Sequence, residues 1–244
     1  MSSHTTSANL RAVAFIDGQN LFNDAKREFG YEYLNIDVKK LATAICQEKG
    51  WQLAETRFYT GVPTAKQNPT LKKFWDNELF QMRLDGVVAR AFDLRDREAK
   101  ITLYRRILVS VPSSRTQLLE EIEIAPCWVT DRGQSLDHDT VVSQAALSEK
   151  GVDVSIAVDA IRYALEAKYD VCLILSRDAD LSPAVAEIKN IGLRSGVNFL
   201  VATVFPSNRT DAYGIPQADI TIRITKAIYD NHLDPKDYFP KKRT

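Results

Sequence analysis

The sequence has little of two residue types that often build active sites. Its 244 residues include three cysteines and three histidines. The cysteines are far apart, with no C-x-x-C pair, so neither a disulfide framework nor a cysteine zinc site is indicated. The histidines, His4, His138 and His232, are equally scattered. This argues against a histidine-centred mechanism and favours histidines at the surface.

The chain has neither an excess of one charge nor a long hydrophobic run. It has 32 lysines and arginines against 32 aspartates and glutamates, which argues against a polybasic nucleic-acid coat but leaves room for a local basic groove. No apolar run approaches the roughly 18 residues of a membrane span, and residues 1–9 lack the apolar core of a secretion signal. We therefore expect a cytoplasmic protein without a membrane segment.

What the chain does have is a regular alternation of short apolar runs and amphipathic segments. The expected strands are residues 11–17, 51–60, 86–92, 171–175, 198–205 and 220–224. The expected helices are residues 20–29, 38–49, 70–84, 152–168 and 182–193, with one more after the last strand. Nearly continuous apolar strands that alternate with helices predict an α/β fold with a mainly parallel sheet covered on both faces.

The alternation is interrupted between about residues 93 and 148. A charged stretch leads there into two β-like runs, residues 101–111 and 121–130, separated by a Pro-Ser-Ser turn. We interpret this region as an insertion that carries a β-hairpin. The expected organisation is a flexible tail at 1–10, one α/β domain at 11–232 with this insertion, and a basic tail at 233–244.

Aspartates stand where strands end or a helix begins. Asp17 closes the first strand, Asp178 and Asp180 follow the strand at 171–175, and Asp153 opens a long helix. Because ligand sites of parallel sheets lie at the carboxyl ends of the strands, these carboxylates can converge. Clustered carboxylates repel one another, and a hard cation such as Mg²⁺ or Mn²⁺ relieves this repulsion. The alternative for each aspartate is a turn or helix cap.

Three motifs around these aspartates resemble a known family. They are FIDGQN at 15–20, KGVDV at 150–154 and SRDADL at 176–181. In this order they resemble the NYN domain of the LabA-like group, a branch of the PIN-like nuclease superfamily, and the resemblance runs from about residue 11 to 225 around the insertion. It implies a PIN-like three-layer α/β/α sandwich and a metal-dependent endoribonuclease.

The resemblance also implies roles for individual residues. Asp17, Asp153 and Asp178 would be the catalytic carboxylates, and with Asp180 they would bind Mg²⁺ or Mn²⁺. Metal ions can activate water and stabilise the charge of phosphodiester cleavage, so no histidine is required. The implied accessory residues are Asn20, Asp180, Lys150 and Asp219. Asn20 would orient water or phosphate, or else only begin a helix, and Lys150 would contact phosphate or serve as a counter-charge.

Basic residues that could hold single-stranded or structured RNA are dispersed along the chain, and each can alternatively belong to a solvated charged face. They are Lys72, Lys73, Arg95, Arg97, Lys100, Arg105, Arg106 and Arg177. Tyr104 and Trp128 are candidate stacking rings. Glu78 is the candidate for the acidic residue that many PIN-like nucleases carry on the third helix.

Other enzyme classes fit less well. A haloacid dehalogenase phosphatase needs a second aspartate two residues after Asp17, where Gln19 stands, and a Toprim enzyme needs a glutamate at the end of strand one. The phosphate-binding motifs G-x-x-x-x-G-K-[ST] and G-x-G-x-x-G are missing. The remaining alternative is a PIN-like module that binds RNA or a protein without cleaving, and a homo-oligomer is compatible with either function.

Overall fold

The computed structural model describes residues 10–32, 36–97, 103–110, 116–124, 146–148 and 151–240. Three of the candidate site residues named above, Lys100, Trp128 and Lys150, lie outside this set. The chain divides into two compact units, one formed by residues 1–94 with 149–244 and the other by residues 95–148. The predicted insertion at about 93–148 overlaps the second unit.

The first unit is built on a six-stranded sheet in which every neighbouring pair is parallel. The strand order is β10-β9-β8-β1-β2-β3. The strands are β1 (Arg11–Asp17), β2 (Gln52–Val62), β3 (Val88–Asp93), β8 (Val171–Leu175), β9 (Leu200–Pro206) and β10 (Ile220–Ile224). All five residues of β8 are buried, as expected for a strand covered on both faces. The prediction of a parallel α/β sheet is confirmed.

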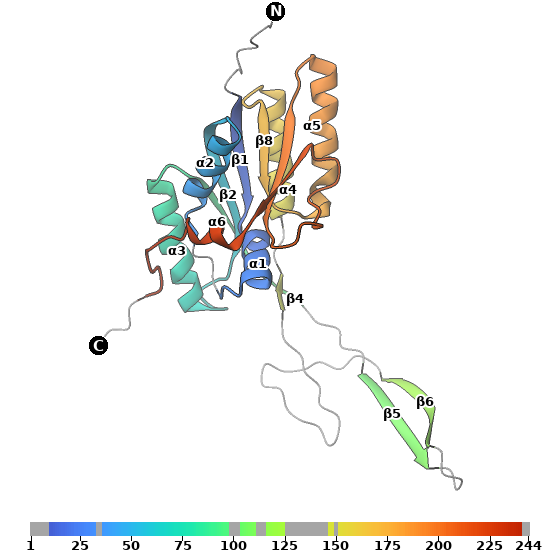
Figure 1. Ribbon diagram of the computed structural model, residues 1–244. Helices are drawn as coiled ribbons and strands as arrows, with labels where there is room; N and C mark the ends of the chain where they lie inside the picture. The colour runs from blue at the N-terminus through green and yellow to red at the C-terminus, as the bar shows by residue number, and fades with distance from the viewer. Residues whose placement is uncertain are drawn as a thin grey trace, which may run out of the picture. The chain divides into compact units, whose positions relative to one another are not determined.

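Helices cover both faces of this sheet (Figure 1). They are α1 (Gly18–Phe29), α2 (Val38–Glu48), α3 (Pro69–Leu84), α4 (Val152–Leu165), α5 (Ser182–Ser195) and α6 (Lys226–Asp230), with a short 3-10 helix, η1 (Ala179–Leu181). Ile16 of β1 shares a core with residues of α1, α2, α3 and α6, whereas Phe15 shares the opposite core with α4 and α5. Successive residues of a strand face opposite sides, so β1 feeds two cores and the three-layer sandwich is confirmed.

In its described residues, the second unit contains two antiparallel strand pairs. β4 (Arg95–Arg97) pairs with β7 (Ala146–Ser148), and β5 (Leu103–Ser110) pairs with β6 (Thr116–Ile124). The second hairpin strand starts at 116 rather than at the expected 121, because the antiparallel pairing with β5 already begins at Thr116, opposite Ser110. Arg95 and Arg97 belong to β4, and Arg105 and Arg106 belong to β5.

Within the described part of the chain, no helix combines the length and the apolar character needed to cross a membrane.

Glu78 lies on the buried face of α3 rather than at the carboxyl ends of the strands. Its side chain is 2% exposed, and its Oε2 has no hydrogen-bond partner among the described residues. Burial, followed by the charge of Asp234, raises the pKa of Glu78 well above its usual value. The charge that acts on Glu78 is thus that of the C-terminal segment, and the expectation that it joins the aspartates is not supported by its surroundings.

Replacing Glu78 by Gln is expected to flatten the pH dependence of stability. Because the folded-state pKa is raised, wild-type stability falls as pH rises above the unfolded value of about 4.3, with a limiting slope of about 1.4 kcal/mol per pH unit. Glu78→Gln removes this loss, so its advantage over wild type should grow between pH 5 and pH 8 in urea unfolding. Glu48→Gln, at a side chain that is 66% exposed, is the matched control. If the free energies of unfolding of wild type and Glu78→Gln changed in parallel with pH, the raised pKa of Glu78 would be contradicted.

Candidate functional site

Asp17 is the last residue of β1 and the N-cap of α1. Its Oδ1 accepts a hydrogen bond of 2.9 Å from the Asn20 backbone N–H, and the residue is 4% exposed. The Asn20 side chain in turn accepts from the Arg177 backbone N–H at 3.3 Å. Asn20 therefore connects the first motif with the third, which is a structural role at the start of a helix.

Asp178 and Asp180 follow β8, the strand that pairs with β1. Asp178 is the N-cap of η1, and its Oδ1 accepts from the Asp180 backbone N–H at 2.9 Å. Asp180 stands in the first turn of η1 and is exposed. The capping role considered for single aspartates thus applies to Asp17 and Asp178, and an N-cap carboxylate keeps a second oxygen for another partner.

Asp153 is the second residue of α4. The N-cap of this helix is Gly151, whose φ of +94° suits glycine, and the helix has no side-chain cap. Asp153 therefore does not cap α4. Its carboxylate lies in the first turn, where the helix dipole favours negative charge.

Electrostatics place the aspartates next to one another. Burial, followed by the charges of Asp153 and Asp178, raises the pKa of Asp17 to about 7 despite the opposing backbone hydrogen bond. The pKa of Asp153 is also raised, first by burial and then by Asp178 and Asp180. Asp153 and Asp178 thus repel Asp17, and Asp178 and Asp180 repel Asp153. We call these four carboxylates, at the ends of β1 and β8 and the start of α4, the acidic edge.

The donor chemistry of this acidic edge suits a hard divalent cation. Carboxylate oxygens are the ligands that Mg²⁺ and Mn²⁺ prefer. The pKa of Asp17 is raised by burial and then by its acidic neighbours, and a bound cation would offset the repulsion from these neighbours. Among the described residues, however, no group of three or more His, Cys, Asp or Glu side chains is arranged to hold a metal ion. Three carboxylates could therefore bind one cation only if their side chains rearranged.

Replacing Asp17 by Asn is expected to stabilise the metal-free protein at pH 8. Since the pKa rises from 3.8 to about 7, wild type loses stability between pH 4 and pH 7, with an upper limit of about 4 kcal/mol. Asn caps helices as well as Asp does, so we expect Asp17→Asn to gain about 2 kcal/mol at pH 8 in EDTA and nothing below pH 4.

The control for this variant is Asp37→Asn, which makes the same change at the more exposed N-cap of α2. Urea unfolding at a series of pH values measures both variants. A stability difference between Asp17→Asn and wild type that does not grow with pH would show that Asp17 ionises freely.

Asp219 lies at the opposite end of the sheet from the acidic edge. Its carboxylate accepts from the Val201 backbone N–H at 2.8 Å and pairs with Lys189 of α5 at 2.5 Å. Val201 pairs with Cys172, and Cys172 pairs with Val13. Asp219 is therefore level with Val13, which precedes Asp17 by four residues and lies about 13 Å from it along the strand.

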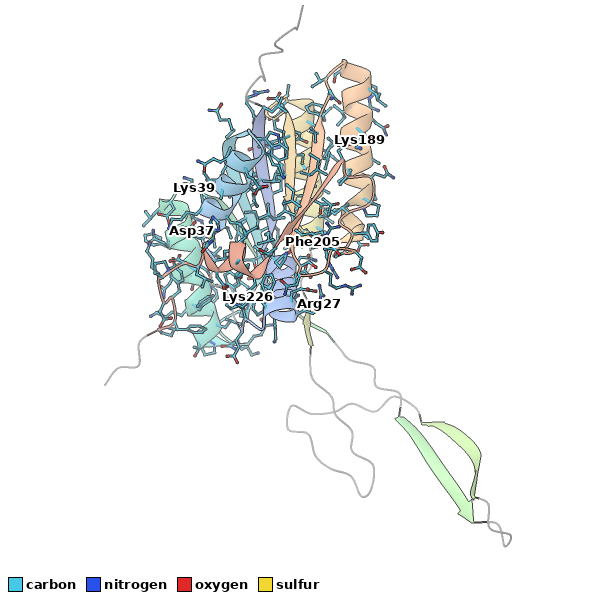
Figure 2. The ribbon with its side chains drawn as sticks, viewed as in Figure 1. Arg27, Asp37, Lys39, Lys189, Phe205 and Lys226 are labelled. Carbon is cyan, nitrogen blue, oxygen red and sulfur yellow. The ribbon has the colours of Figure 1, made fainter. Side chains whose placement is uncertain are left out.

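The side chains in Figure 2 agree with this separation: Lys189 lies near the middle of α5, whereas Phe205 and Arg27, which belongs to α1, lie lower in the view. The structure therefore does not bring Asp219 into the site. Its carboxylate stabilises the start of β10, which explains an aspartate at this position.

Two of the described basic candidates, Arg177 and Lys72, contact acidic side chains other than the four aspartates. The remaining ones are distant from those aspartates in the sequence. Arg177 approaches Asp24 of α1 at 3.6 Å, and its guanidinium lies 5.6 Å from the ring centroid of Phe205. Lys72 pairs with Asp76 within α3, while Lys73 is exposed on the same helix.

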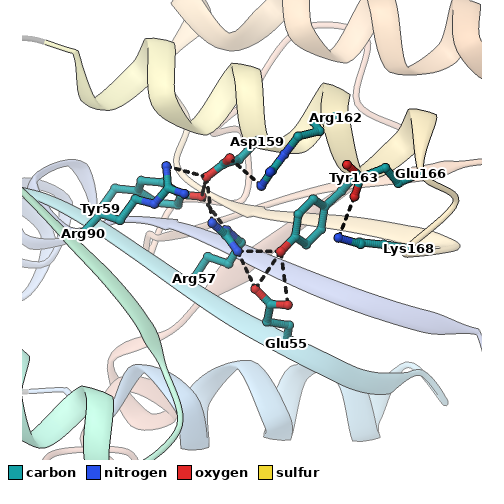
Figure 3. Close-up of polar contacts among 9 residues, drawn as sticks. All are labelled: Glu55, Arg57, Tyr59, Arg90, Asp159, Arg162, Tyr163, Glu166 and Lys168. Carbon is teal, nitrogen blue, oxygen red and sulfur yellow. Dashed lines mark hydrogen bonds and ion pairs between the residues drawn. The ribbon is translucent and has the colours of Figure 1, made fainter.

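A buried polar network beside the acidic edge was missed by the sequence analysis (Figure 3). Its centre is Arg57 of β2, whose side chain is 4% exposed. The guanidinium donates to Glu55, Tyr59, Tyr163 and Asp159 at 2.6 to 2.8 Å. Arg57 stands between Glu55 and Tyr59 at the two-residue spacing that puts side chains on one face of a strand. This spacing is the signal that could have predicted the network, because a buried charge must be paired.

Asp159 of α4 links this network to the surface. Its carboxylate accepts from the Tyr59 hydroxyl at 2.7 Å and also pairs with Arg90 of β3 at 3.2 Å and with Arg162 at 3.1 Å. These last two guanidinium side chains are 45% and 47% exposed. The network therefore joins a buried ion pair to two arginines at the surface.

The family model of the NYN domain matches residues 120–213. This range contains the second and third motifs but not the first, and over these residues it confirms the resemblance to NYN domains. NYN domains form a branch of the PIN-like nuclease superfamily, and the parallel sheet covered by helices on both faces is consistent with a PIN-like fold.

Among solved structures, a protein of unknown function from Vibrio parahaemolyticus is similar over 96% of this chain and 98% of that chain, with 15% identity and a TM-score of 0.43. No curated protein matches the chain.

Proposed function

We propose that this protein is a metal-dependent endoribonuclease that hydrolyses single-stranded RNA at the acidic edge, and that its NYN domain belongs to the LabA-like group. The observation that carries the proposal is the buried carboxylate of Asp17, surrounded by the charges of Asp153 and Asp178. The NYN match supports a nuclease, and the oxygen donors support Mg²⁺ or Mn²⁺ as the cofactor.

The residues of the acidic edge have distinct tasks in this proposal. Asp17, Asp153 and Asp178 would hold the cation with help from Asp180, and a bound cation would supply Lewis-acid chemistry at the scissile phosphate. Asn20 keeps Arg177 and the following Asp178 in place through the hydrogen bond to the Arg177 backbone. The hydrogen bonds at Asp17 and Asp178 preorganise both carboxylates, so that less rearrangement accompanies metal binding.

Incubation of the purified full chain with 5′-labelled single-stranded RNA in Mn²⁺, Mg²⁺ or EDTA tests this function. We expect internal cleavage with either metal, none in EDTA, and recovery when metal is added back in excess. Cleavage that persists in EDTA would overturn the metal dependence. RNA that is retained but never cut with any metal would instead establish the binding-module alternative.

A further inference from the structure

Three arginines surround a single buried carboxylate on the α4 side of the sheet. Asp159, 5% exposed, contacts Arg57, Arg90 and Arg162. Glu55 is the second carboxylate bound to Arg57, so three positive charges face two negative ones. Arg57 is buried, and the excess charge is therefore presented to solvent by the half-exposed Arg90 and Arg162 (Figure 3).

The strand register places Arg90 beside the acidic edge. Asp17 pairs with Tyr59, and Tyr59 pairs with Arg90, so these residues form one row across β1, β2 and β3. Neighbouring strands are about 4.8 Å apart, which puts the Cα of Arg90 roughly 10 Å from that of Asp17. Because Tyr59 and Arg90 both contact Asp159 of α4, the row faces α4, the helix whose first turn contains Asp153.

Both exposed arginines have the chemistry of phosphate contacts. A guanidinium has five N–H donors in a planar fork that matches phosphate oxygens, and each of these two uses only part of that set on Asp159. Asp159 also fixes their positions, which lowers the entropy cost of binding a ligand. The net charge of the chain is zero, so a polyanion must find its positive charge locally.

We propose that Arg90 and Arg162 bind the RNA phosphate next to the scissile phosphate, which lies at the acidic edge. Asp159 positions both arginines for this contact. The proposal rests on the proposed ribonuclease function. A carboxylate cluster repels the phosphates that flank the scissile one. Arg90, whose Cα is roughly 10 Å from that of Asp17, and Arg162, which contacts the same Asp159, offset that repulsion on the β3 side.

The test is the double variant Arg90→Gln/Arg162→Gln, with Arg11→Gln as the control. Arg11 is matched to Arg90 in exposure, at 48%, and in its pairing with an aspartate, but it begins β1 at the other end of the strand. Binding of a labelled 20-nucleotide single-stranded RNA is measured by fluorescence anisotropy in EDTA at several salt concentrations. Binding and cleavage are thereby separated.

We expect the double variant to bind RNA about 10-fold more weakly at low salt, and its salt slope to fall by roughly 0.7 for each phosphate that is no longer neutralised. Arg11→Gln should remain within about 2-fold of wild type. Arg90→Lys, which keeps the charge, should keep the salt slope and so exclude a purely structural defect.

Equal RNA affinity of the double variant and Arg11→Gln would overturn the phosphate-binding proposal even if wild type cleaves RNA. Wild type that binds RNA without cleaving it would remove the nuclease function and leave the phosphate-binding proposal to be decided by the affinities. Wild type that neither binds nor cleaves would overturn both.

Discussion

Asp178→Asn is expected to reduce the rate of RNA cleavage at least 100-fold while the fold is retained. Asparagine can still accept the hydrogen bond from the Asp180 backbone, so the cap of η1 is preserved. The substitution removes one negative charge from the acidic edge. Supporting residues of metal sites typically contribute about 10-fold to 100-fold to affinity or activity, and a direct ligand should contribute at least as much.

The measurement is single-turnover cleavage of labelled RNA in saturating Mn²⁺, together with calorimetric titration of the metal. Asp219→Asn provides the matched control, because it makes the same substitution at the other end of the sheet. We expect Asp219→Asn to cleave RNA at a rate within about 3-fold of wild type, because Asp219 contacts Val201 and Lys189 and lies outside the acidic edge. If Asp178→Asn retained full activity and metal affinity, the acidic edge would not be the site of cleavage.

Arg57→Ala is expected to lower the free energy of unfolding by about 3–5 kcal/mol. Its guanidinium is 4% exposed, and removal leaves Glu55, Tyr59 and Tyr163 without their shared donor. Loss of one partner from a buried ion pair typically costs this much. For a chain of this length the melting temperature should fall by about 10 °C.

The destabilisation should shrink in acid. Burial alone would raise the pKa of Asp159, but the hydrogen bond from Tyr59 and the charges of Arg57 and Arg90 outweigh it, so the pKa is lowered. A lowered pKa contributes stability above the unfolded value of about 3.9 and loses it as pH falls further. The difference between wild type and Arg57→Ala should therefore decrease below pH 4.

Two comparisons separate charge from packing in this experiment. Arg57→Met keeps most of the side-chain volume and should destabilise less than Arg57→Ala if packing contributes. Arg11→Ala removes a surface arginine from an exposed pair and should cost less than about 1 kcal/mol. Equal effects of Arg57→Ala and Arg11→Ala in urea unfolding would show that the network does not stabilise the fold.

The sequence by itself determined the layout of the α/β unit. The apolar runs at 11–17 and 171–175 predicted β1 and β8, because a strand buried on both faces needs continuous apolar residues. Asp17 and Asp178 follow from the same runs, since the residue at which a strand ends is a local property. Because parallel strands end at a common edge of the sheet, the sequence also predicts that these two aspartates lie close together.

The tertiary structure decided which other charged side chains lie near that edge. Asp219 was predicted from a motif, but the register of β9 and β10 places it about 13 Å away along the strands. The sequence analysis did not select Arg57, Arg90 or Asp159 as site residues. They form a network only because β2, β3 and α4 pack together. Local patterns fix where strands and helices begin and end, whereas partners about 100 residues apart depend on register and packing, which no local pattern contains.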